Sequence, residues 1–154
     1  MDAAGTPLAL PGNSPVCRPA SPRNCFPVQP AHRILIADDD RDFRQGVADL
    51  LASLSRKFQI VQAESGVEAL VFLRGHPIDL ALLDMHMPGH TGLEVLTLLR
   101  IETRAVPCIF ISGDATDGVR QLALHEGACA VLKKPVRPEL LRAEVRRVLR
   151  LDAA

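Results

Sequence analysis

Three short apolar runs in this chain each end in charged side chains. The runs and the charges that follow them are 34–37 with Asp38 and Asp39, 80–83 with Asp84, and 130–132 with Lys133 and Lys134. Short apolar runs of this kind are typical of strands that are buried on both faces of a parallel sheet. Such sheets bind ligands beyond the carboxyl ends of their strands, where these charges would lie. The pattern therefore predicts an acidic pocket that faces one cation.

Strand-like and helix-like segments alternate from His32 to the end of the chain. Helices are indicated by apolar residues at helical spacing, by capping boxes that start at Ser65 and Thr91, and by Pro138 in a first turn. The expected strands are 33–37, 58–61, 80–84, 108–112 and 129–133, and the expected helices are 43–54, 65–75, 91–104, 116–126 and 138–149. Because every strand is too apolar to face water, helices must cover both faces of the sheet. The predicted fold is a doubly wound (βα)5 three-layer α/β sandwich with a flavodoxin-like, five-stranded parallel sheet.

The first 31 residues differ in composition from the rest of the chain. They hold seven of the twelve prolines and only three charged residues, Asp2, Arg18 and Arg23. Proline removes backbone donors and disfavours regular structure. We therefore expect a flexible, Pro-rich N-terminal tail at 1–31 and one domain of ordinary size at 32–152.

The overall charge of the chain points to no particular class of partner. Its 154 residues include 18 basic and 18 acidic side chains, so the formal net charge is zero. No block of like charge indicates binding to nucleic acid or to a membrane surface. There is no secretory signal and no apolar stretch of about 20 residues, and the four cysteines lack metal-site or redox spacing. We therefore expect a protein of the reduced cytoplasm.

The acidic residues suggest phosphoryl chemistry if the first strand lies beside the third. Asp38, Asp39 and Asp84 would then converge, and a hard divalent cation such as Mg²⁺ would relieve their repulsion. A carboxylate beside a metal and a lysine can attack phosphorus and form an aspartyl phosphate, which makes Asp84 the candidate nucleophile. Ser112, at the end of the fourth expected strand, would donate a hydrogen bond to the phosphoryl group, although an ordinary strand-end serine is the alternative.

Two neighbours of these residues are expected to take no part in the chemistry. Asp40 should cap the first helix, because aspartate is among the best N-cap residues. Lys133 alternates with Lys134 along a strand, so its side chain should point to the opposite side.

Residues 33–151 resemble the receiver domain of two-component response regulators. The resemblance rests on four motifs in the family's order and spacing: 34–40 (ILIADDD), 79–89 (DLALLDMHMPG), 109–113 (IFISG) and 133–135 (KKP). It implies that Asp84 is the phosphoacceptor, Ser112 the switch hydroxyl and Lys134 the phosphate-binding lysine, with a cis peptide bond before Pro135. The Mg²⁺ ligands that it implies are the acidic pair Asp38 and Asp39, together with Asp84 and the backbone carbonyl of His86.

The resemblance also implies a signalling function. A sensor histidine kinase or a histidine phosphotransfer protein would pass a phosphoryl group to Asp84, and an unknown downstream protein would read the change. The chain would then be a phosphoacceptor and not an enzyme, apart from self-phosphotransfer and autodephosphorylation, with no direct contact to nucleic acid or membrane. Whether it is a stand-alone receiver or a fragment, and whether phosphorylation drives homodimerisation through the last two helices, stays open.

Three residues leave alternatives open. Most receivers carry an aromatic residue where this chain has Val131, so the usual aromatic readout is absent. His86 and Asp114 lie at positions that tune phosphoryl lifetime in the family, or they are two solvated loop residues.

The other function classes are a receiver-fold binding module that works without phosphorylation and a metal-dependent phosphohydrolase. The phosphohydrolase is disfavoured because such enzymes commonly carry the nucleophile and the general acid two residues apart on the first strand, whereas Asp84 ends the third expected strand alone.

Overall fold

The computed structural model describes residues 32–102 and 104–151, and in this part of the chain five strands alternate with five helices. The predicted tail, residues 1–31, lies outside these residues. The strands are β1 (His32–Ala37), β2 (Phe58–Ala63), β3 (Leu80–Asp84), β4 (Cys108–Ser112) and β5 (Ala130–Lys133). They form one parallel sheet in the order β2-β1-β3-β4-β5. The predicted doubly wound, flavodoxin-like fold is confirmed.

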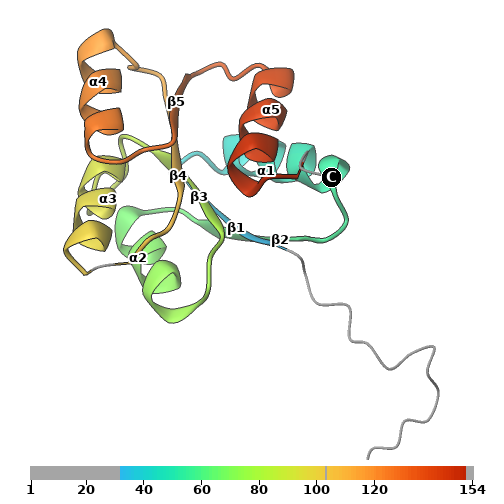
Figure 1. Ribbon diagram of the computed structural model, residues 1–154, viewed down its shortest axis with the longest axis horizontal. Coiled ribbons are helices and arrows are strands. Elements are labelled where there is room, and N and C mark those ends of the chain that lie inside the picture. The colour runs from blue at the N-terminus through green and yellow to red at the C-terminus, as the bar shows by residue number, and fades with distance from the viewer. Residues whose placement is uncertain (1–31, 103, 152–154) are drawn as a thin grey trace, which may run out of the picture.

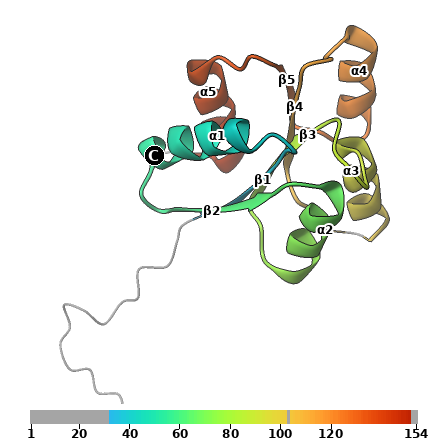
Figure 2. The same ribbon diagram turned by 180° about the vertical axis from the view of Figure 1, so that it is seen from behind.

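The helices cover the sheet in two unequal layers. They are α1 (Arg41–Leu54), α2 (Gly66–Gly75), α3 (Gly92–Ile101), α4 (Asp117–His125) and α5 (Pro138–Leu149). Helices α1 and α5 lie on one face, whereas α2, α3 and α4 lie on the other (Figure 1), and the view from behind shows the same three layers (Figure 2). Among the described helices, none combines the length and the apolar composition that a membrane crossing requires.

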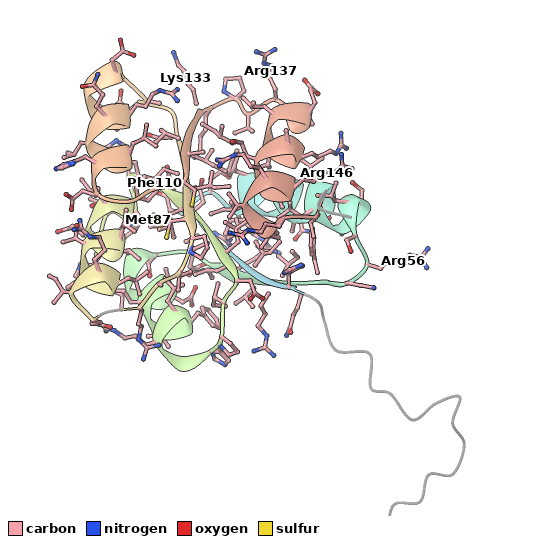
Figure 3. All side chains as sticks on the ribbon, in the orientation of Figure 1. Arg56, Met87, Phe110, Lys133, Arg137 and Arg146 are labelled. Carbon is pink, nitrogen blue, oxygen red and sulfur yellow. The ribbon has the colours of Figure 1, made fainter. Side chains whose placement is uncertain are left out.

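The sheet separates two hydrophobic cores. Successive residues of β1 contribute to opposite cores, because side chains alternate across a strand: Leu35 packs toward α2 and α3, whereas Ile34 and Ile36 pack toward α1 and α5. Phe110 of β4 is fully buried in the core on the α3 side and lies in the interior of the molecule (Figure 3). Each fully buried side chain of this size contributes roughly 1.5–3 kcal/mol, so the two cores hold the strand ends in place.

The helices begin within two residues of the predicted positions, and side chains cap the free amides of most of them. Asp40 accepts hydrogen bonds from the backbone N–H groups of Asp42 and Phe43, which confirms its role as the cap of α1. Thr91 and Glu94 form a full, reciprocal capping box at α3. At α2 the hydroxyl of Ser65 accepts from Glu68, but the Glu68 carboxylate accepts the N–H of Glu64 rather than that of Ser65.

Several element ends differ from the prediction by one to three residues, and tertiary contacts explain those at the ends of β2 and α3. Strand β2 continues to Ala63, two residues beyond its apolar run, because Ala63 pairs with Ala37 and accepts the N–H of Asp38. Helix α3 ends at Ile101 rather than near Arg104. The backbone N–H of Arg104 donates to the carbonyl of Leu99, five residues earlier, so the chain has left the helical hydrogen-bond pattern there.

Gly92, the first residue of α3, touches the end of strand β3. Its N–H donates to the carbonyl of Met85, and a Cβ atom on Gly92 would lie 2.5 Å from the carbonyl oxygen of Asp84 and 3.3 Å from a ring carbon of Phe110. This close approach fixes the backbone that carries Asp84. By contrast, a Cβ atom on Gly46, on the exposed side of α1, would meet nothing within 4 Å.

We expect the two glycines to respond in opposite directions to alanine. Gly92→Ala should lower the free energy of unfolding by roughly 1–3 kcal/mol, because the new methyl group overlaps backbone. Gly46→Ala should raise it by roughly 0.5–1 kcal/mol, because alanine is the better helix former. Urea unfolding of both variants measures the difference. A Gly92→Ala protein as stable as the unsubstituted chain would contradict the close approach.

Candidate functional site

The three aspartates predicted to converge do so at the carboxyl edge of the sheet. Asp38 and Asp39 follow β1 directly, and Asp84 ends β3, which pairs with β1. One carboxylate oxygen from each residue lies within 4.8 Å of the others. Asp38 is 1% exposed and Asp84 is 7% exposed, whereas Asp39 faces solvent. The cluster is therefore a buried acidic pocket with one open side.

Lys134 supplies the cation of this pocket. Its backbone N–H donates to the carbonyl of Ser112, and the peptide bond to Pro135 is cis, as the family resemblance implies. The ammonium nitrogen lies 2.7 Å from Oδ2 of Asp38 and 3.6 Å from Oδ1 of Asp84. The side chain of Lys133 is exposed and points away from the molecule (Figure 3), which confirms that only the second lysine faces the acids.

Asp38 is held on both sides of its carboxylate. Oδ2 accepts from Lys134, and Oδ1 accepts the backbone N–H of Asp40 at 2.8 Å. Its own N–H donates to the carbonyl of Ala63 on β2. Because both carboxylate oxygens are already occupied, Asp38 has less capacity for a further ligand than Asp39 or Asp84.

Ser112 lies at the end of β4 and is fully buried. Its hydroxyl oxygen accepts the N–H of Asp114 at 3.1 Å, which ties the start of the following loop to the strand. Lys133 is its partner in the β4–β5 register, so Ser112 and Lys134 belong to the same edge of the sheet. The structure therefore brings the five predicted side chains to this edge: Asp38, Asp39, Asp84, Ser112 and Lys134.

The charges in the pocket shift two pKa values. Burial is the main cause that raises the pKa of Asp84, and the negative charge of Asp38 raises it further, against the opposing effects of Lys134 and of the N–H of His86. Burial disfavours the charged form of Lys134, but its contacts with Asp38 and Asp84 outweigh this effect and raise its pKa. The raised pKa of Lys134 reflects the two carboxylates beside it, whereas the raised pKa of Asp84 reflects its burial first and the charge of Asp38 second.

The donor set fits a hard divalent cation. Three carboxylates face one ammonium, so two units of negative charge remain unbalanced when all four groups are ionised. Mg²⁺ and Ca²⁺ prefer oxygen ligands, and Mg²⁺ retains several of its waters, for which the exposed side of Asp39 leaves room. The residues present therefore match the predicted metal site in charge and in ligand type.

The side chains of His86 and Asp114 lie close to each other beside the pocket. Nε2 of His86 lies 3.6 Å from Oδ2 of Asp114, and both side chains are mostly exposed. The N–H of His86 donates to the Asp84 carboxylate. The two residues therefore lie next to the candidate nucleophile and near one another, which favours a role at the site over two unrelated loop residues.

Two contacts of the pocket were missed by the sequence prediction. The ring of Phe43, on the first turn of α1, lies 4.4 Å from the ammonium of Lys134, a cation–π contact. The buried guanidinium of Arg44 donates to the carbonyl of Asp38. A signal for Arg44 existed in the sequence, because this cation occupies the apolar face of α1, three and seven residues before Val47 and Leu51.

We expect Asp84→Asn to stabilise the metal-free protein. The raised pKa of Asp84 means that the folded state binds its proton more tightly than the unfolded state, so stability falls as pH rises from the ordinary value of 3.8 through the raised value. Asparagine avoids this cost, so we expect the Asp84→Asn protein to be the more stable of the two at pH 7. The gain should shrink as pH falls toward 3.8.

Urea unfolding at pH values from about 4 to about 7 tests this expectation, because the stability difference should grow across this range. Asp49→Asn is the matched control, because Asp49 is an exposed aspartate on α1 that only accepts from Gln45. A destabilised Asp84→Asn protein at pH 7 would contradict the raised pKa of Asp84.

The chain has curated relatives that are signalling proteins. The cyclic di-GMP phosphodiesterase response regulator RpfG of Xanthomonas campestris is 32% identical over 120 residues, which cover 77% of this chain and 32% of that protein. The transcriptional regulatory protein CpxR of Escherichia coli is 35% identical over 119 residues, with coverage of 77% and 50%. The CAI-1 autoinducer sensor kinase/phosphatase CqsS of Vibrio cholerae is 33% identical over 129 residues, with coverage of 80% and 18%. The chain therefore spans half or less of the length of these relatives.

Solved structures and a family model agree with these relatives. The signal receiver domain of NarL from Mycobacterium tuberculosis superposes with a TM-score of 0.71 at 31% identity, covering 77% of this chain and 96% of that one. The receiver domain of the Francisella response regulator 1452 shares the fold, with a TM-score of 0.73 at 24% identity and coverage of 79% and 98%. The sequence model of the response regulator receiver domain matches residues 34–146. By both sequence and fold, this chain belongs to the response regulator receiver domain family.

Proposed function

We propose that residues 32–152 form a receiver unit that accepts a phosphoryl group on Asp84 from a phosphohistidine. An oxygen of the Asp84 carboxylate attacks phosphorus, the P–N bond of the donor breaks, and the released imidazole takes up a proton. The observation that carries this proposal is the place of Asp84 in a buried pocket, with two further carboxylates and an ammonium directed at the same point.

Each of the surrounding side chains has a role in this proposal. Lys134, already 3.6 Å from Asp84, binds an oxygen of the arriving phosphoryl group. The hydroxyl of Ser112 turns from its bond with the Asp114 N–H and donates to the same group. Asp39, Asp84 and the carbonyl of His86 would hold Mg²⁺, with Asp38 acting through water because its own oxygens are occupied. When bound, the metal supplies positive charge that offsets the negative charge of the phosphoryl oxygens.

The proposed partners follow from the chemistry and from the relatives. A phosphohistidine donor implies a sensor histidine kinase or a histidine phosphotransfer protein, and one relative is itself named a sensor kinase/phosphatase. We place this reaction in the cytoplasm, where such donors carry their phosphoryl groups. The chain acts as a phosphoacceptor switch in this proposal, and its only chemical steps are self-phosphotransfer and loss of the phosphoryl group.

The output route must work without an aromatic residue at position 131. Val131 is buried under α4, and Arg120 of α4 donates to its carbonyl at 2.9 Å. A groove of about 590 Å³ follows β5 between α4 and α5, with Arg120, Leu124 and Leu140 among its lining residues. We propose that a downstream protein reads this surface, because the loop that joins Ser112 to α4 connects it to the phosphorylation site.

Phosphorylation by a small acyl phosphate with Mg²⁺ tests the proposed function. We expect an acid-stable, base-labile mass gain of one phosphoryl group, absent in Asp84→Asn. Asp79→Asn is the matched control, because Asp79 precedes the same strand at its other end and an amide oxygen still accepts the N–H of Arg33. Unaltered labelling of Asp84→Asn would exclude Asp84 as the acceptor. No labelling of the unsubstituted protein would favour the binding module.

The contact between His86 and Asp114 should lengthen the lifetime of the phosphorylated state. The N–H groups of these residues bind the Asp84 carboxylate and the Ser112 hydroxyl, so a contact between the two side chains should hinder the water that attacks the aspartyl phosphate. We expect His86→Ala and Asp114→Ala to speed the loss of the phosphoryl group by several-fold, and to a similar extent, since each removes the same contact. His76→Ala, which changes an exposed histidine after α2, is the control. Unchanged decay in both variants would assign the pair to the solvated surface.

A further inference from the structure

Arg44 stands out among the buried residues of the described part of the chain. Only four charged or polar residues are buried there: Asp38, Asp84, Ser112 and Arg44. The first three belong to the proposed phosphorylation site. Arginine is almost never buried without a specific partner, because removing its charge from water costs several kcal/mol. The fourth residue therefore needs a reason for its position.

The hydrogen bonds of Arg44 connect it to the proposed phosphorylation site. Its Nη1 donates to the backbone carbonyl of Asp38 at 2.6 Å, and its Nε donates to the side-chain oxygen of Gln62 on β2 at 3.2 Å. The nearest carboxylate contact is with Glu64, whose side chain is exposed and lies 3.9 Å from Nη2. The shortest bond of the guanidinium is thus made to the backbone of the acidic pair, and not to an opposite charge.

This bond fixes the peptide plane between Asp38 and Asp39. A peptide unit is rigid, so the orientation of the Asp38 carbonyl also sets the N–H and the Cα atom of Asp39. The Asp39 carboxylate has no hydrogen bond to any other described residue, and its side chain is exposed. The position of this carboxylate therefore depends on its backbone.

We propose that Arg44 is a positioning residue, which holds the Asp38–Asp39 peptide so that the Asp39 carboxylate is directed into the divalent-cation site. The inference rests on the proposed function, since it concerns the same site. Arg44 itself touches neither the metal ligands' carboxylates nor the phosphoryl group: it acts through the backbone carbonyl of Asp38.

The charge of Arg44 and its hydrogen bond to Asp38 predict opposite changes in Mg²⁺ affinity when the residue is replaced. A cation next to a metal site repels the metal, so loss of its charge alone would tighten Mg²⁺ binding. Loss of the bond to Asp38 would weaken binding, and partners of this kind are worth about 10–100-fold in metal affinity. The direction of the change therefore decides between the two effects.

The experiment compares Arg44→Met, Arg44→Lys and Gln62→Leu in the full chain. Mg²⁺ titration is followed through the backbone amide signals of residues near Asp39 and Asp84 by NMR. We expect the dissociation constant to rise about tenfold or more in Arg44→Met. Arg44→Lys, which keeps the charge but loses the guanidinium geometry, should also bind more weakly. Gln62→Leu, which removes the other close partner of Arg44 and leaves the Asp38 carbonyl bond, should stay within about twofold of the unsubstituted protein, well below that range.

A second readout needs no metal. The N–H of Asp39 lies in the peptide plane that Arg44 holds, so its NMR order parameter should be near 0.85 in the unsubstituted protein and clearly lower in Arg44→Met, toward about 0.6. An unchanged order parameter together with unchanged or tighter Mg²⁺ binding would overturn the inference. If Arg44→Met does not fold, the Mg²⁺ dissociation constant and the Asp39 order parameter of Arg44→Lys test the inference in its place. Failure of the unsubstituted protein to bind Mg²⁺ would instead count against the proposed function, while the order parameter still tests Arg44.

Discussion

The contact between the Lys134 ammonium and the Asp38 carboxylate joins two side chains that are 96 residues apart in the sequence. It lies at the point where strands β1, β3, β4 and β5 end side by side, and it offsets part of the repulsion among three carboxylates. Without a cation, ionised acids this close would favour protonation or an opened pocket. When all four groups are ionised, the three carboxylates still carry more negative charge than this one ammonium offsets.

Two backbone contacts support this charge cluster in addition to the packing of the cores. Gly92 brings the start of α3 against the carbonyl of Asp84, and Arg44 holds the carbonyl of Asp38 from α1. These two contacts approach the acidic pair and the candidate nucleophile from opposite layers of the sandwich. A site built on strand ends and held in this way keeps its geometry before any ligand arrives, which limits the reorganisation that binding requires.

Much of the architecture was predictable because local and tertiary preferences agree. Apolar strands, capping residues such as Asp40 and Thr91, and Pro138 at the first turn of α5 led to the correct order of elements. Element ends were less predictable. Strand β2 gains two residues by pairing with β1, and α3 loses its last turn to an irregular bond from Arg104, neither of which is encoded in a local pattern.

The sequence by itself determined which residue types meet at the strand ends, because the alternation of apolar runs and acidic or basic residues admits few other folds. It also pointed to the cis bond before Pro135, through the family resemblance. Only the tertiary structure decided which charged groups lie in contact. Lys134 lies closer to Asp38 than to Asp84, and the buried guanidinium of Arg44 donates to a backbone carbonyl. The reason is that distances among groups far apart in the chain depend on strand order and helix packing, which local sequence patterns do not specify.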